Sequence, residues 1–217
     1  MKKEFEKRIL SSLVIVPISF FFVIKGSTFF TFFLGIFFLA TCYEWFKMTK
    51  KNLIKVLGIL FLCFAFYLAF LLRNEAGLDF FIFIIIICIF TDIGGYIFGK
   101  TFKGPKLTKI SPNKTYSGLI GSFILSIMAG SIFSQYQKSF ILSEIFILNN
   151  NELSYIVIIL FISAVSQIGD LIVSYFKRLA KIKNTGNLLP GHGGLLDRVD
   201  GIIFAIPTSY LLFIYLN

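Results

Sequence analysis

Apolar runs long enough to cross a membrane recur along the whole chain and constrain its fold more than any other feature. A transmembrane helix needs about 20 mostly apolar residues to cross the ~30 Å hydrocarbon layer of a bilayer. A run at 139–148 covers only ten residues and contains Glu144, so it is interpreted as an interfacial or re-entrant piece. Seven longer runs are predicted to span the bilayer: 9–24, 27–43, 56–72, 78–98, 116–133, 154–175 and 201–216.

The composition agrees with lipid as the solvent of this chain. Of its 217 residues, 57% are hydrophobic and 15% charged, whereas soluble domains are about 45–50% apolar and about 25% charged. One histidine and three cysteines exclude a two-histidine zinc motif, a Cys/His metal cluster and a dense disulfide framework. We therefore expect an all-α, polytopic integral membrane protein with about seven transmembrane helices, folded as a single transmembrane domain over residues 1–217.

The lysines and arginines predict how this domain is oriented. With the N-terminus in the cytoplasm, 18 of these 21 residues fall in cytoplasmic segments and 3 fall in segments on the outer side of the membrane, as the positive-inside rule requires. The net charge of +10 is thus interpreted as cationic cytoplasmic loops rather than as a nucleic-acid-binding surface. The C-terminus is expected outside. Two cytoplasmic segments, near residues 99–118 and 176–200, carry most of the unusual residue choices.

Two aspartates fall inside predicted spans. Asp92 lies in the fourth span and Asp170 in the sixth, each near its cytoplasmic end. A charge at mid-bilayer costs at least ~2.5–3.5 kcal/mol, so such residues normally face a partner or a wet cavity. Helical spacing places Ser174, Lys177 and Arg178 on the same face as Asp170. A structural aspartate paired with a lysine or arginine of another helix is the alternative, but two at matching depth favour a shared polar site.

A third acidic element precedes the last span and follows a glycine-rich segment. Asp197 and Asp200 are three residues apart, which puts both carboxylates on one side of a helical turn, an arrangement that suits Mg²⁺. The segment 184–194 fits neither the dinucleotide-binding nor the P-loop pattern, but its glycines expose backbone N–H groups that can surround phosphate. His192 could donate to a phosphate or transfer a proton, and a flexible linker with a turn-capping histidine is the alternative.

The segment 99–118 contains a constrained turn. Its glycines, prolines and five lysines argue against a continuous helix. The turn would present Ser111, Lys114 and Thr115, and a lysine there can bind phosphate as a point charge. Lys103, Lys106 and Lys109 are interpreted as part of a solvated cationic loop.

Together these segments resemble the phosphatidate cytidylyltransferase (CDP-diacylglycerol synthase) family, over the chain from about residue 40 to the end. Glu44-Trp45 adds a weak match, and Asn184 stands where the family usually has an acidic residue. The strongest match is Ser174-x-Phe176-Lys177-Arg178, Lys183, Gly186, Leu189-Pro190, His192-Gly193-Gly194-Leu195 and Asp197-Arg198-Val199-Asp200. Two upstream segments also match, Thr91-Asp92 with Gly95-Tyr96 and Gly99, and Ser111-Pro112-x-Lys114-Thr115-x-x-Gly118.

The resemblance implies that CTP and membrane phosphatidate react to give CDP-diacylglycerol and pyrophosphate. It further implies Mg²⁺, with a second cation left open, and a bacterial inner-membrane enzyme whose site faces the cytoplasm. No nucleic acid is expected as a partner, and a homodimer is left open. The expected catalytic residues are Asp170, Asp197, Asp200, Lys177 and His192, with the three aspartates as metal ligands. The expected substrate-binding residues are Arg178, Lys183, Gly193, Gly194, Arg198, Asp92, Ser111, Lys114 and Thr115.

Two other functions fit part of the same pattern. In a proton- or cation-coupled transporter, Asp92 and Asp170 would relay protons or bind a cation. Such proteins often carry inverted repeats, and none is evident in this sequence. A CTP-dependent transferase or kinase acting on an isoprenoid lipid is the second alternative, because apolar residues do not specify the acceptor.

Overall fold

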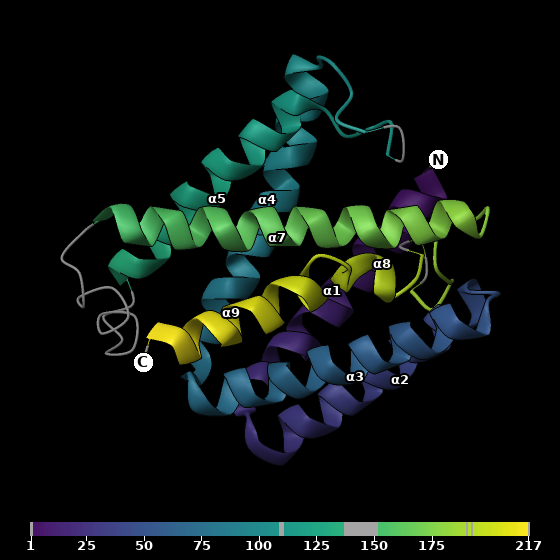
Figure 1. The fold of residues 1–217 in the computed structure, drawn as a ribbon, viewed down its shortest axis with the longest axis horizontal. Coiled ribbons are helices and arrows are strands. Elements are labelled where there is room, and N and C mark those ends of the chain that lie inside the picture. The colour runs from purple at the N-terminus through teal and green to yellow at the C-terminus, as the bar shows by residue number, and fades with distance from the viewer. Residues whose placement is uncertain (1, 109–110, 137–151, 190, 192, 217) are drawn as a thin grey trace.

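The chain folds as a set of helices joined by short connections (Figure 1). The computed structural model describes residues 2–108, 111–136, 152–189, 191 and 193–216. Its seven long helices coincide with the seven predicted spans, so the all-α prediction is confirmed, while the expected interfacial piece at 139–148 lies outside the described residues. The elements are α1 (Lys2–Lys25), α2 (Ser27–Met48), α3 (Asn52–Glu75), α4 (Gly77–Phe102), α5 (Tyr116–Tyr136), α7 (Glu152–Leu179), α8 (Leu196–Val199) and α9 (Ile202–Leu216).

Helix is the structure that a membrane imposes on such a sequence, because every backbone polar group must find its partner within the segment. Within the described residues, α2, α3, α4, α5 and α7 are long and apolar enough to cross a bilayer. The apolar stretches of α1 and α9 are shorter, Leu13–Lys25 and Ile202–Tyr215. A polytopic membrane protein is therefore confirmed, whereas the number of crossings and their orientation stay predictions.

The core of the bundle is centred on α4. Phe83, Ile84 and Ile87 of this helix are completely buried, and they belong to one apolar cluster with Ile159 and Ile162 of α7. The same cluster includes residues of α2, α3 and α9. Because neighbouring helices pack on α4 from several sides, the polar residues near its C-terminal end are held in fixed positions.

Helices α4 and α5 form a hairpin whose backbones nearly touch. A Cβ atom added to Gly94 would lie 2.4 Å from the carbonyl oxygen of Gly121, and one added to Gly118 would lie 2.8 Å from that of Gly95. Small residues that allow such close approach are typical of helix pairs in membranes, where lipid tails provide no hydrophobic drive for association.

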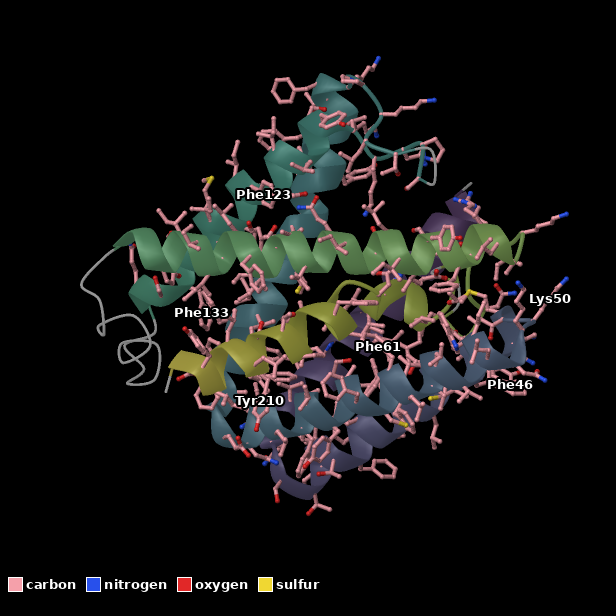
Figure 2. All side chains as sticks on the ribbon, viewed as in Figure 1. Phe46, Lys50, Phe61, Phe123, Phe133 and Tyr210 are labelled. Carbon is pink, nitrogen blue, oxygen red and sulfur yellow. The ribbon has the colours of Figure 1, made fainter. Side chains whose placement is uncertain are left out.

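Figure 1 shows α7 running across the molecule, with the loop end of the α4–α5 hairpin above it and α9, α3 and α2 below it, while α4 crosses behind it. The start of α1, the α2–α3 turn, the α4–α5 loop and the α7–α8 segment all lie toward the right of this view. Figure 2 shows Lys50 at that end of the α2–α3 pair and Tyr210 toward the opposite end. The four segments expected in the cytoplasm therefore share one end of the bundle.

Candidate active site

A cavity of about 320 Å³ at this end of the bundle is lined by four aspartates and two lysines. Asp92 comes from α4 and Asp170 from α7, while Asp197 and Asp200 come from α8 and the residue that follows it. The sequence predicted that these aspartates share one site, and the structure brings all four to the same cavity. The two lysines are Lys114, from the α4–α5 loop, and Lys177, from α7.

Lys114 reaches across the cavity to α7. Its Nζ lies 2.5 Å from Oδ2 of Asp170, and the Ser174 hydroxyl donates to Oδ1 of the same aspartate at 3.2 Å. Asp170 is thus paired with a lysine of another segment, as the sequence analysis expected if this aspartate had a structural role. It also lines a polar cavity, so the two interpretations hold together.

The α4–α5 loop is folded so that Lys114 points across to α7. The Leu107 N–H donates to the Lys114 carbonyl at 2.7 Å, and the Lys114 N–H donates to the Ser111 carbonyl at 3.0 Å. Thr115 follows as a cavity-lining residue, and its Oγ1 accepts the Gly118 N–H at 3.1 Å at the start of α5. Of the predicted turn residues, Lys114 and Thr115 line the cavity, whereas Ser111 closes the turn through its backbone.

Lys177 lies between the two C-terminal aspartates. Its side chain is buried, with Nζ 2.8 Å from Oδ1 of Asp197 and 3.7 Å from Oδ2 of Asp200. Burial raises the pKa of Asp200 well above its ordinary range, and the negative charge of the neighbouring Asp170 raises this pKa further. The negative charges of Asp170 and Asp92 both act on Asp200, whereas the positive charge of Lys177 opposes them. Negative charge is therefore concentrated here beyond what the lysines offset.

The second oxygen of Asp197 holds the glycine-rich segment. Oδ2 accepts the backbone N–H groups of Thr185 at 2.8 Å and Gly194 at 3.1 Å. Further out, Leu189 and Gly193 exchange two backbone hydrogen bonds of 3.0 and 3.2 Å, which closes a hairpin. Gly193 has a φ of 90°, a conformation that favours glycine. The segment is thus a hairpin fixed to Asp197 rather than a free linker.

The remaining predicted site residues lie beside the cavity rather than in its wall. Arg178, Lys183 and Arg198 are exposed, and an Arg178 guanidinium nitrogen donates to the Ile182 carbonyl at 3.5 Å. Gly193 and Gly194 are buried in the hairpin next to Asp197, and His192 lies outside the described residues. Contacts of these residues with substrate stay predictions.

Sequence reasoning assigned no role to three polar residues of this region. Gln167 lines the cavity, and its Nε2 is buried without a hydrogen-bond partner among the described residues. Thr185 and Glu44 are buried, and their side chains are hydrogen-bonded to each other although they lie 141 positions apart in the chain. The signal for Glu44 was a carboxylate at the end of an apolar run, the same signal that identified Asp92 and Asp170.

The donor set of the cavity suits Mg²⁺. Carboxylate oxygens are the hard ligands that this ion prefers, and it is usually held by one or two carboxylates together with substrate phosphates. Across the described ranges, no three His, Cys, Asp or Glu side chains are grouped closely enough to hold an ion without such help. Both carboxylate oxygens of Asp170 and of Asp197 already contact hydrogen-bond donors of the protein, so an ion would replace part of these contacts. The predicted roles of Asp170, Asp197 and Asp200 as ligands stay predictions.

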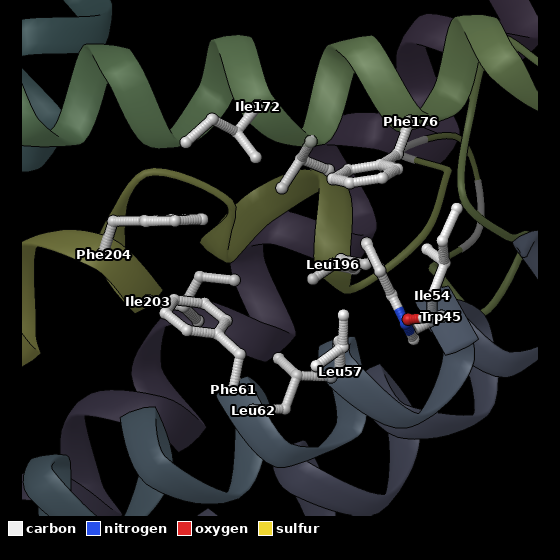
Figure 3. A pocket seen from close by; sticks show the side chains of 12 residues that line it. Trp45, Ile54, Leu57, Phe61, Leu62, Ile172, Phe176, Leu196, Ile203 and Phe204 are labelled. Carbon is white, nitrogen blue, oxygen red and sulfur yellow. The ribbon is translucent and has the colours of Figure 1, made fainter.

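A second cavity, of about 260 Å³, is lined by other residues of α7 and α8 (Figure 3). Trp45 packs there against Phe176, with ring centroids 5.0 Å apart, and Phe61 packs against Phe204 at 4.5 Å. Every lining residue is apolar or glycine: Trp45, Ile54, Leu57, Gly58, Phe61, Leu62, Ile172, Val173, Phe176, Leu196, Ile203 and Phe204.

Comparison with known proteins gives the class to which this arrangement belongs. The model of the Cytidylyltransferase family matches residues 53–216, so the chain belongs to that family. A phosphatidate cytidylyltransferase of Rickettsia conorii is 31% identical over 219 residues, covering 99% of this chain and 94% of the relative. One from Rickettsia bellii is 31% identical over 214 residues, 97% of this chain and 91% of the relative. One from Bacillus subtilis is 35% identical over 152 residues, 70% of this chain and 53% of that relative.

Proposed function

We propose that this protein transfers CMP from CTP to phosphatidate, forming CDP-diacylglycerol and releasing pyrophosphate. The observation that carries the proposal is the cavity in which Asp92, Asp170, Asp197 and Asp200 meet Lys114 and Lys177. Membership of the Cytidylyltransferase family and the names of the similar relatives support this reaction over a transporter. The acceptor is taken from those relatives, because an apolar surface does not specify it.

In the proposed reaction, a phosphate oxygen of phosphatidate attacks the α-phosphorus of CTP. The new P–O bond forms as the bond to the bridging oxygen of the β-phosphate breaks, and pyrophosphate takes that electron pair. The attacking oxygen is already anionic, so little base catalysis is needed. The main demand is to bring two anions together and stabilise the transferring group, which positioned cations meet.

The two lysines of the cavity meet part of this demand. Lys114 is held by Asp170 and Lys177 by Asp197, so their ammonium groups stay in place without substrate. Substrate phosphates that reach them would gain charge-assisted hydrogen bonds. The Gln167 amide, whose Nε2 has no hydrogen-bond partner among the described residues, supplies a further donor. These groups orient the phosphates and reduce their mutual repulsion.

The carboxylates of the cavity are suited to hold Mg²⁺. Asp170 and Asp200 would hold the ion, and substrate phosphate oxygens would complete its ligands. When bound, it would offset the negative charge that builds on the departing pyrophosphate.

We further propose that the cavity faces the cytoplasm at the inner membrane of a bacterium. The four cationic segments share the end of the bundle at which the cavity lies, and such segments are retained in the cytoplasm. At that boundary a water-soluble nucleotide meets a lipid headgroup. The proposal includes no nucleic-acid partner and does not require a second copy of the chain.

The direct test is transfer of labelled CMP by the purified protein in phosphatidate-containing micelles. We expect Mg²⁺-dependent product from phosphatidate and little from an isoprenyl phosphate. Asp170→Asn should lower the rate by about 10²-fold or more, because it removes a charged group from the reacting site. Asp79→Asn, in the first turn of α4 at its other end, is the matched control. Equal rates for Asp170→Asn and wild type, or consumption of CTP without phosphatidate, would contradict the proposal.

A further inference from the structure

Glu44 is a buried carboxylate on a helix that supplies no residue to the polar cavity. It lies in α2, its side chain is among the most completely buried, and the residue is 1% exposed. Ion pairs between described residues join Lys114 or Lys177 to aspartates and leave Glu44 out. An ionised carboxylate buried in this way is costly unless hydrogen-bond donors surround it.

Three donors meet Glu44. One lies on the first arm of the glycine hairpin, residues 184–189, and two lie where the second arm, which begins at Gly193, enters α8. On the first arm, the Thr185 hydroxyl donates to Oε2 at 2.9 Å. On the second arm, the Leu195 N–H donates to Oε1 at 2.9 Å and the Leu196 N–H donates to Oε2 at 2.8 Å. One side chain of α2 therefore holds both arms together.

Two glycines make room for this contact. A Cβ atom on Gly186 would lie 2.6 Å from Oε1 of Glu44. A Cβ atom on Gly194 would lie 2.5 Å from Oε2 and 2.0 Å from Oγ1 of Thr185. Any larger residue at either position would force the carboxylate away from its donors.

Asp197 holds the same two arms from the side of the polar cavity. Its Oδ2 accepts the N–H groups of Thr185 and Gly194, while Oδ1 accepts from Lys177. Thr185 thus lies between two carboxylates, with its N–H bonded to Asp197 and its hydroxyl bonded to Glu44. Displacement of Thr185 would change the environment of Asp197 and, through it, of Lys177.

We propose that Glu44 is a positioning residue for nucleotidyl transfer, which fixes the hairpin arms so that Asp197 and Lys177 keep their places in the cavity. The inference rests on the function proposed above for that cavity. Glu44 makes no contact with the cavity itself, so its effect is transmitted through Thr185 and the start of α8. A role confined to general stability of the fold would predict a different pattern of results.

The sharpest test removes one donor and leaves the carboxylate. Thr185→Val deletes the hydroxyl that bonds Glu44, whereas Thr185→Ser keeps it and serves as the matched control. We expect Thr185→Val to lower kcat for CMP transfer by about tenfold, the scale of losing a hydrogen bond to a charged group, and Thr185→Ser to stay within about twofold. Glu44→Gln, which places an amide group against one N–H donor, should lower kcat at least as much.

A second measurement reports the hairpin without using activity. Trypsin can cleave after Lys183 on the first arm and after Lys51 in the α2–α3 turn, both of which are exposed. In Thr185→Val and Glu44→Gln we expect faster cleavage after Lys183 and unchanged cleavage after Lys51. Wild type and Thr185→Ser should give the same two rates as each other.

The outcomes separate the two proposals. Wild-type rates of transfer and of Lys183 cleavage in both Thr185→Val and Glu44→Gln would overturn the positioning role. So would equal acceleration at Lys183 and Lys51 with a lowered melting temperature, because this indicates general destabilisation. If wild-type protein transfers no CMP, the proposed function fails, while selective loosening at Lys183 would still establish that Glu44 holds the hairpin.

Discussion

Helices α7 and α8 separate two cavities of similar size, about 320 and 260 Å³, that share no lining residue. Asp170 and Lys177 of α7, with Asp197 of α8, face the polar cavity. Phe176 and Leu196, each next to one of these residues in sequence, face the apolar cavity. Both elements are therefore amphipathic inside the protein, with each face matched to a different neighbour.

The comparison shows how a charged site is held inside an apolar bundle. The apolar face meets residues of α2, α3 and α9 around the second cavity, where Trp45 of α2 packs against Phe176 of α7. The polar face then presents its side chains at set positions, and ion pairs hold them without substrate. We therefore expect substitutions on the polar face to change chemistry more than stability, and the reverse on the apolar face.

The largest effect is expected from Lys177→Met, which keeps the length of the side chain and removes its charge. Asp197 and Asp200 would lose the lysine between them, and substrate phosphates would lose a positioned cation, so kcat should fall by about 10²–10³-fold. Initial rates of CMP transfer measure this, with the exposed Lys47→Met as control. A rate within threefold of wild type would contradict the role of the polar face.

Asp200→Asn should separate activity from stability. The rate should fall by about 10²-fold, because a predicted metal ligand becomes neutral. The pKa of Asp200 is raised in the fold, so its ionised form costs stability at pH values above the ordinary pKa of an aspartate. Asp200→Asn should therefore melt at or above the wild-type temperature near neutral pH, and this advantage should vanish as pH falls. A lower melting temperature near neutral pH is the contrary result.

On the apolar face, Gly58→Ala should change stability more than activity. Its new Cβ would lie 1.9 Å from Nε1 of Trp45, so the indole would have to move. Overpacking of this kind costs about 1–3 kcal/mol, which thermal unfolding in micelles would detect. We expect the rate of CMP transfer to stay within about threefold of wild type. Loss of transfer without loss of stability would show that the two faces are not separable.

The smallest effect is expected from Ile203→Val in the wall of the apolar cavity. Ile203 is 6% exposed, and removal of one methylene from such a site costs about 0.5–1.5 kcal/mol. Activity at a temperature well below the transition should be unchanged. The measurement is the ratio of the variant's CMP-transfer rate to the wild-type rate at low temperature. A tenfold lower rate for the variant would contradict the separation of the two faces.

Much of the fold could be predicted, because lipid dictates both the secondary structure and the hydropathy of a span. The predicted positions of all seven helices are confirmed, but their lengths are not. The run at 56–72 corresponds to α3 over Asn52–Glu75, and the run at 154–175 corresponds to α7 over Glu152–Leu179. Hydropathy marks only the most apolar part of a helix, whereas backbone hydrogen bonding continues into its polar ends.

The site could be predicted less completely. Aspartates in apolar runs identified Asp92 and Asp170, because their cost demands a polar environment. The partners of Asp197 could not be predicted, since the N–H groups of Thr185 and Gly194 meet it only after the hairpin closes. Glu44 belonged to a weak two-residue match, and its role could not be predicted, because its partners also meet it only in the folded chain. Its three donors lie 141 to 152 positions further along the chain.

The close approach of α4 and α5 has a consequence for the width of the polar cavity. Asp92 lies on one of these helices, and Thr115 directly precedes the other. Where Gly94 meets Gly121 the two main chains touch directly, so no side-chain rotation can alter their separation. Gly94→Ala would act as a wedge that pushes the hairpin open, although it adds only a methyl group. The contact between α4 and α5 therefore sets the spacing of this side of the cavity, and movement of side chains alone does not change it.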